Sequence, residues 1–222
     1  MASVPLGQVN APQPGPALLV AVREQGSASH PYNSSPELLS GPAASRNLAD
    51  AIHFLCALHG RQPGIVELVA MRTVGPAARE WLGETAAAFA RERAYLARLA
   101  VQAGPVPATP GAGSEAVVAM QRNAIMTLAQ SERRGCAIGT AAAIAADWSV
   151  MRKVMDCAAI RFGMDPAQPW RAGEAASIEA AVAALGDDPA MRRALLFGAE
   201  QVAIQHRGLW DLLAARAGAR SA

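Results

Sequence analysis

Lysine and cysteine are both scarce in this chain, and the distribution of the basic residues and of the cysteines narrows the classes of function. Lys153 is the only lysine, and the 20 basic residues are spread along the 222 positions instead of being clustered. Phosphate binding needs a concentrated basic face, so nucleic acid is not expected as a partner. The 3 cysteines form no Cys-x-x-Cys pair, which argues against a disulfide framework and favours a reducing compartment.

Charged side chains are missing from the first 22 residues, and long apolar runs are missing from the whole chain. A signal peptide opens with a basic segment, so secretion is not expected. The most apolar uncharged run that suits a helix, residues 135–146, is well short of a membrane span. We therefore expect a cytoplasmic protein without a membrane partner.

Recognisable catalytic motifs are missing as well. The sequence contains no Gly-x-Ser-x-Gly elbow of the kind that presents a nucleophilic serine. The stretch RRGCAIGTAAA, residues 133–143, carries two glycines but lacks the Gly-Lys-Ser/Thr of a phosphate loop, and it follows a helix instead of a strand. We interpret its glycines as a place of close helix packing.

The composition of the chain favours α-helix. It is rich in alanine, and strand-type alternation does not occur. Cap and turn residues predict helices over about 44–59, 63–73, 76–103, 174–185 and 189–217. Between them, one helix is predicted from 114 to a break near Gly135–Gly139, and another from that break to 163. The break is predicted because the apolar stripe changes phase there.

The predicted fold class is therefore all-α. Residues 44–222 are expected to form a single bundle of about seven helices, with three or four long helices at its centre. Residues 1–43 contain Pro, Gly, Ser and Asn throughout. We expect them to form an irregular or partly disordered lead-in to the bundle.

Four polar residues interrupt the apolar faces of these helices and form the candidate site. Glu92 and Glu132 fall in the middle of the apolar stripes of two long helices. His59 and His206 fall on or beside the stripes of the first and last predicted helices. Because a buried carboxylate costs several kcal/mol unless it is paired or hydrogen-bonded, each of these residues needs a partner inside the bundle.

Two interpretations of these residues stay open. Each glutamate can pair with an arginine from a neighbouring helix, and His59, near the end of its helix, can bond the free carbonyl groups there. Alternatively, the four side chains converge on a metal ion, which would be iron or another divalent metal. His53 and Asp50, in contrast, lie on the polar side of their helix and are expected to be exposed.

The helical layout with inward glutamates resembles the ferritin-like superfamily. In that family, a Glu on each of two helices and a Glu-x-x-His on each of two others hold two metal ions. In this chain Tyr95 follows Glu92, and Gly135 follows Glu132, at the place of the family's histidine. The resemblance implies Glu92 and Glu132 as ligands in a degenerate member of an uncharacterised bacterial family, with the two inward histidines as substitutes.

Two hypotheses about function follow. The primary one is a non-catalytic helical bundle that binds a small ligand or a protein partner in its interior, with a homodimer as a compatible assembly. The competing one is a ferritin-like, metal-dependent oxidoreductase that uses Glu92, Glu132, His59 and His206. Geometry separates them, because metal binding requires at least three of these side chains within coordination distance of one point.

Overall fold

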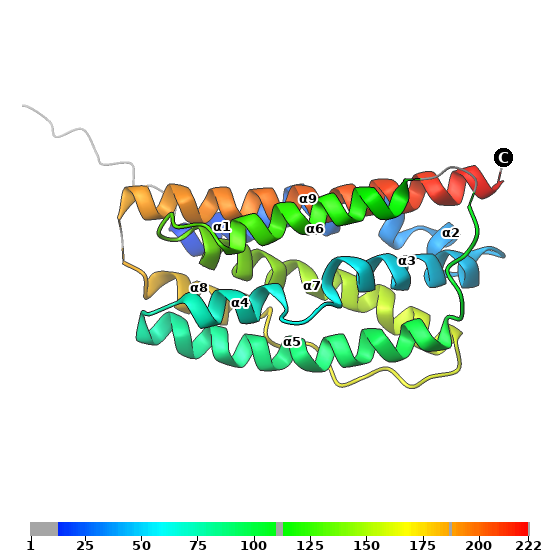
Figure 1. The fold of residues 1–222 in the computed structure, drawn as a ribbon, viewed down its shortest axis with the longest axis horizontal. Coiled ribbons are helices and arrows are strands. Elements are labelled where there is room, and N and C mark those ends of the chain that lie inside the picture. The colour runs from blue at the N-terminus through cyan, green and yellow to red at the C-terminus, as the bar shows by residue number, and fades with distance from the viewer. Residues whose placement is uncertain (1–12, 110–112, 187, 222) are drawn as a thin grey trace, which may run out of the picture.

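The computed structural model describes residues 13–109, 113–186 and 188–221, which form an all-α bundle without a strand (Figure 1). The α-helices are α1 (Pro14–Gln25), α2 (Pro36–Leu39), α3 (Ala44–His59), α4 (Ile65–Arg72), α5 (Pro76–Gln102), α6 (Ser114–Ala129), α7 (Cys136–Arg161), α8 (Ala175–Ala183) and α9 (Pro189–Ser221). Two 3-10 turns, η1 (Ser27–Ser29) and η2 (Pro31–Ser34), lie between α1 and α2. The predicted fold class is confirmed. No helix in the described ranges is both long and apolar enough to span a membrane.

The predicted helix limits agree best where a cap or a breaker sets them. Helix α3 covers the predicted range, and α5 and α9 begin at Pro76 and Pro189, since proline suits a first helical turn. The predicted break in the long central helix is the turn that follows α6 and ends at Gly135. Gly135 has a φ of 96°, a left-handed conformation that favours glycine.

Helix α7 runs through the middle of the bundle and packs most extensively on α9 (Figure 1). Their backbones approach closely: a side chain at Gly139 would overlap the carbonyl oxygen of Leu195, and one at Gly198 would overlap that of Cys136. This confirms that the glycines of RRGCAIGTAAA serve helix packing. Because α7 is buried along most of its length, its polar side chains must find partners inside the protein.

The prediction of an irregular lead-in is wrong for residues 13–43. Helix α1 buries Leu18 and Val22 and packs on α8 and α9, while Leu38 of α2 is also fully buried. The Pro, Gly, Ser and Asn residues that suggested disorder are local caps and first-turn residues: Ser35, for example, accepts a hydrogen bond from the Leu38 amide. The rest of that prediction, residues 1–12, lies outside the described part of the chain.

Candidate functional site

Glu92 lies in the middle of α5 and is only 5% exposed, as its position on the apolar stripe predicted. Its carboxylate accepts hydrogen bonds from the guanidinium Nη1 of Arg152 at 2.8 Å and from the indole Nε1 of Trp148 at 2.9 Å. Both donors come from α7, one helical turn apart. The hypothesis of a buried ion pair with an arginine of a neighbouring helix is therefore confirmed for Glu92.

Arg152 donates to three further acceptors, one carboxylate and two backbone carbonyls. Its Nε donates to Asp156 at 2.9 Å, and its two terminal nitrogens reach the backbone carbonyls of Gln168 and Ala167 at 2.8 and 2.6 Å. Arg152 therefore ties α5 and α7 to the segment that follows α7. Burial raises the pKa of the Glu92 carboxyl, an effect that the Trp148 hydrogen bond and the Arg152 charge oppose.

Tyr95, which stands where the ferritin-like pattern has histidine, belongs to the same network. Its hydroxyl donates to Asp156 at 3.0 Å, and its ring lies 4.9 Å from the Arg152 guanidinium. Burial, followed by the Asp156 charge, raises the pKa of Tyr95 to about 12. The residue therefore stays a neutral phenol that supports the ion pair.

A second buried network is centred on Asp147 of α7, which is 2% exposed. Its carboxylate accepts hydrogen bonds from the backbone amide and the hydroxyl of Ser27, in η1, and from Nδ1 of His206, in α9, at 2.8 Å. Nε2 of His206 in turn lies 3.1 Å from Nε2 of His59. The chain Ser27–Asp147–His206–His59 thus crosses the interior of the bundle.

His59 connects this chain to the first network through an aromatic contact. Its ring meets Trp148 edge-on, with 5.3 Å between the ring centroids, and Trp148 donates to Glu92. Burial lowers the pKa of His59 well below its usual value, and electrostatic interaction with His206, Arg122 and Arg93 lowers it further. His59 is therefore neutral, and a single hydrogen is shared between the two facing Nε2 atoms.

The lowered pKa of His59 predicts acid sensitivity. The folded protein keeps His59 neutral, whereas the unfolded chain takes up a proton below a pH of about 6.5. The stability that the folded protein has while His59 is neutral in both states is therefore fully present above that pH, and it is lost as the pH falls below it. Between pH 7 and pH 5 we expect the free energy of unfolding to fall by a larger amount in the parent protein than in His59→Gln. Urea unfolding at a series of pH values measures it, and parallel curves for the two proteins would contradict it.

Glu132 does not lie inward, and this part of the predicted site is wrong. Its side chain is 92% exposed in the turn after α6, where it pairs with Arg72 at 2.7 Å. The helix ends at Ala129, so the helical phase that placed Glu132 on the apolar stripe does not reach it. Of the four predicted ligands, only His59 and His206 come together. Within the described ranges, no group of three or more His, Cys, Asp or Glu side chains is arranged to hold a metal ion.

The expectation for the polar side of α3 also needs correction. Asp50 is 1% exposed. Its carboxylate accepts two hydrogen bonds from the guanidinium of Arg216 in a bidentate arrangement and one from Arg220, all at 2.8 Å. His53 is half-buried, and its Nε2 donates to the carbonyl of Gly104 at 2.8 Å. The end of α9 covers this face of α3, which a single helix pattern does not reveal.

A cavity of about 940 Å³ lies beside the Glu92 network, between α5 and the segment from Asp165 to Glu174. We call it the α5 groove. Its lining includes Trp81, Thr85, Ala88 and Glu92 on the α5 side. The opposite wall follows the chain after α7, which runs past α5 on its way to α8 (Figure 1).

The outer wall of the α5 groove is held in place from within the bundle. Arg152 binds the carbonyls of Ala167 and Gln168, and the indole of Trp170 donates to the carbonyl of Ala145 at 3.1 Å. Trp170 also packs against Phe89, with ring centroids 4.7 Å apart. The groove is therefore a preformed feature, which sequence reasoning missed because no helix pattern covers residues 164–174.

These observations define an all-α bundle protein with two buried polar networks and a preformed groove along one long helix. Residues 22–221 match a family of unknown function, DUF6975, and the chain belongs to this family. No curated protein and no solved structure matches the chain. The comparisons therefore support an uncharacterised family and give no support to the ferritin-like resemblance.

Proposed function

We propose that this protein is a non-catalytic binder of a small molecule, which it holds in the α5 groove. The observation that carries the proposal is the indole N–H of Trp81. Trp81 lines the groove, is only 7% exposed, and its Nε1 has no hydrogen-bond partner among the described residues. A buried donor without a partner is costly, and a ligand acceptor in the groove would remove that cost once the indole ring turns to expose Nε1, which is shielded from solvent in this structure.

The size of the groove suits this function. Its volume of about 940 Å³ falls at the upper end of the range of small-molecule sites. The aromatic ring of Trp170 and the prolines beside it supply apolar surface, while Thr85 adds a buried hydroxyl. The lining is therefore mixed, and polar groups held in place beside apolar surface orient a bound molecule.

The state of Glu92 favours binding over catalysis. Both of its carboxylate oxygens are engaged, one by Arg152 and one by Trp148, so it is not free to move protons to or from a ligand. Apart from Glu92, which Arg152 neutralises, the charges that line the groove also balance, with Arg91, Arg98 and Arg171 against Glu84, Asp165 and Glu174. We therefore expect a ligand that is neutral or zwitterionic.

A thermal-shift screen with neutral and zwitterionic metabolites tests the proposal. A ligand at 100 times its Kd adds about 2.7 kcal/mol, which should raise the Tm by about 5–10 °C. Ala88→Trp, which fills the groove, should abolish this shift. Ala87→Trp, on the exposed neighbour that does not line the groove, should keep it.

Trp81→Phe provides a second test that does not require filling the groove. It keeps an aromatic ring and removes only the donor, so the affinity for a screened ligand should fall about three- to tenfold. Isothermal titration measures the change. Ligands that stabilise Ala88→Trp as much as the parent protein would overturn the proposal, as would a library without any stabilising compound.

A further inference from the structure

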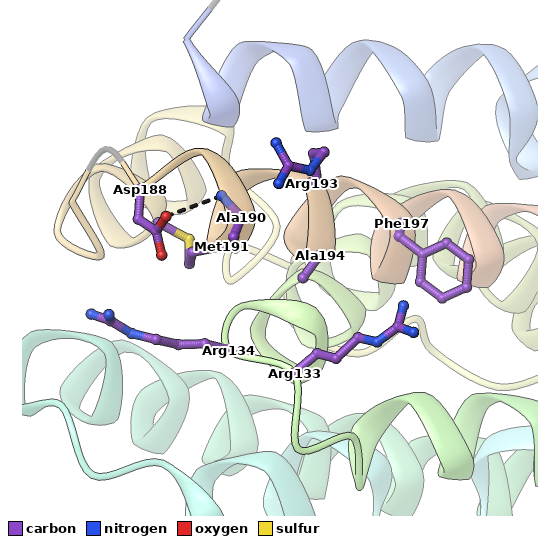
Figure 2. A pocket seen from close by; sticks show the side chains of 8 residues that line it. All are labelled: Arg133, Arg134, Asp188, Ala190, Met191, Arg193, Ala194 and Phe197. Carbon is purple, nitrogen blue, oxygen red and sulfur yellow. Dashed lines mark hydrogen bonds between the residues drawn. The ribbon is translucent and has the colours of Figure 1, made fainter.

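A second cavity lies where the turn between α6 and α7 faces the first turns of α9 (Figure 2). Its volume is about 570 Å³, and we call it the arginine cavity. Three arginines line it together with small and apolar residues of α9: Arg133, Arg134, Arg193, Met191, Ala194 and Phe197. It shares no lining residue with the α5 groove.

The positive charge of the arginine cavity is not balanced by the described residues. None of Arg133, Arg134 and Arg193 forms an ion pair within the part of the chain that the structure describes. Asp188 is the one acid in the lining, and its Oδ1 accepts the backbone amide of Ala190 at 3.0 Å. Glu132, next to Arg133 in the chain, is held by Arg72 at 2.7 Å.

The turn that carries Arg133 and Arg134 packs directly on α9, and the protein surface beside it is partly apolar. At Gly135, directly after Arg134, an added side chain would meet the carbonyl and the side chain of Met191, so the turn lies directly against α9. The ring of Phe197 is 43% exposed beside the cavity. Figure 2 shows Arg133 extending toward Phe197 and Arg134 extending the other way, below Met191. Cationic contacts from Arg133 and apolar contacts from Phe197 are therefore offered side by side.

We propose that the arginine cavity binds a small organic anion that carries an aromatic ring. Arg133, which extends toward Phe197, holds its phosphate, sulfonate or carboxylate group through charge-assisted hydrogen bonds, and the ring packs on Phe197, while Arg134 and Arg193 add to the positive potential of the cavity. A small molecule fits better than a macromolecule because the three arginines line one bounded cavity instead of forming an extended face. This site is separate from the one proposed above, and either can exist without the other.

The aromatic sulfonate 1-anilinonaphthalene-8-sulfonate is a suitable probe, because its fluorescence rises on transfer to an apolar surface. We expect saturable binding in low salt that weakens in high salt and is displaced by inorganic pyrophosphate. The double variant Arg133→Gln/Arg193→Gln should weaken the probe at least tenfold. Arg79→Gln/Arg192→Gln changes the charge equally outside the cavity and should leave binding within about twofold.

Phe197→Ala tests the apolar contact of the site independently of its arginines. It should weaken the aromatic probe while leaving the affinity for pyrophosphate, measured by calorimetry, unchanged. Far-UV circular dichroism establishes that each variant is folded. Equal probe binding by the two double variants, or no saturable binding by the parent protein, would overturn the proposal.

Discussion

Arg152→Met is expected to lower the free energy of unfolding by about 3–5 kcal/mol, because it leaves a buried carboxylate without its counter-charge. Glu92 would keep only the Trp148 indole as a partner, and two backbone carbonyls after α7 would lose their donor. Chemical unfolding at neutral pH, followed by circular dichroism, measures the loss. Against the 5–15 kcal/mol that stabilises a typical protein, this is a large fraction.

Removing the other partner of this ion pair should cost less. Glu92→Leu leaves Arg152 with Asp156 at 2.9 Å and with both carbonyls, so we expect a loss of about 1–3 kcal/mol. Arg161→Met is a matched control, because Arg161 is exposed at the end of the same helix, and it should change stability by no more than about 0.5 kcal/mol. An Arg152→Met variant as stable as this control would refute the structural role assigned to the network.

Asp147→Ala is the second large effect that we expect, again about 3–5 kcal/mol. The substitution removes the acceptor of the Ser27 amide, the Ser27 hydroxyl and His206 Nδ1 together, and all of these groups are buried. Asp147→Asn keeps the shape and one acceptor oxygen, so about half of the loss should be recovered.

The amide of Ser27 offers a local measurement for the same prediction. In the parent protein it should exchange slowly with solvent deuterium, and in Asp147→Ala its protection should drop along with that of α1. Asp165→Ala, on an exposed carboxylate, should leave both stability and exchange unchanged. Fast exchange at Ser27 in the parent protein would contradict the contact itself.

The sequence predicts much of the fold because helix limits depend on local chemistry. Pro76, Pro189 and the glycines after α3 and α6 act on their own few residues, so their effect can be recognised without neighbours. The lead-in helix α1 was missed because prolines that open a helix look the same as prolines in a loop. Only its contact with α8 and α9 separates the two cases.

The candidate site could be predicted only in part, for a related reason. Helical phase identified Glu92, His59 and His206 as inward residues, but it failed for Glu132, which lies beyond the end of its helix. Asp147 lies three residues after Ile144 and four before Met151, so its burial could have been recognised from the stripe. The helical phase of a residue indicates which way its side chain faces, but it does not identify the residue that faces it on the neighbouring helix. The pairing of Glu92 with Arg152 could therefore be found only in the structure.

The Asp147 network also constrains how the chain reaches its folded state. Its donors lie 120 residues before it and 59 residues after it, and Asp50 is paired with an arginine 166 residues later. Contacts so distant along the chain close late, because each needs a long loop to be ordered first. During synthesis, Asp147 therefore lacks His206, and Asp50 lacks its two arginines, until most of α9 has left the ribosome. The last helix completes the interior, and partially made chains carry Asp50 without its counter-charge.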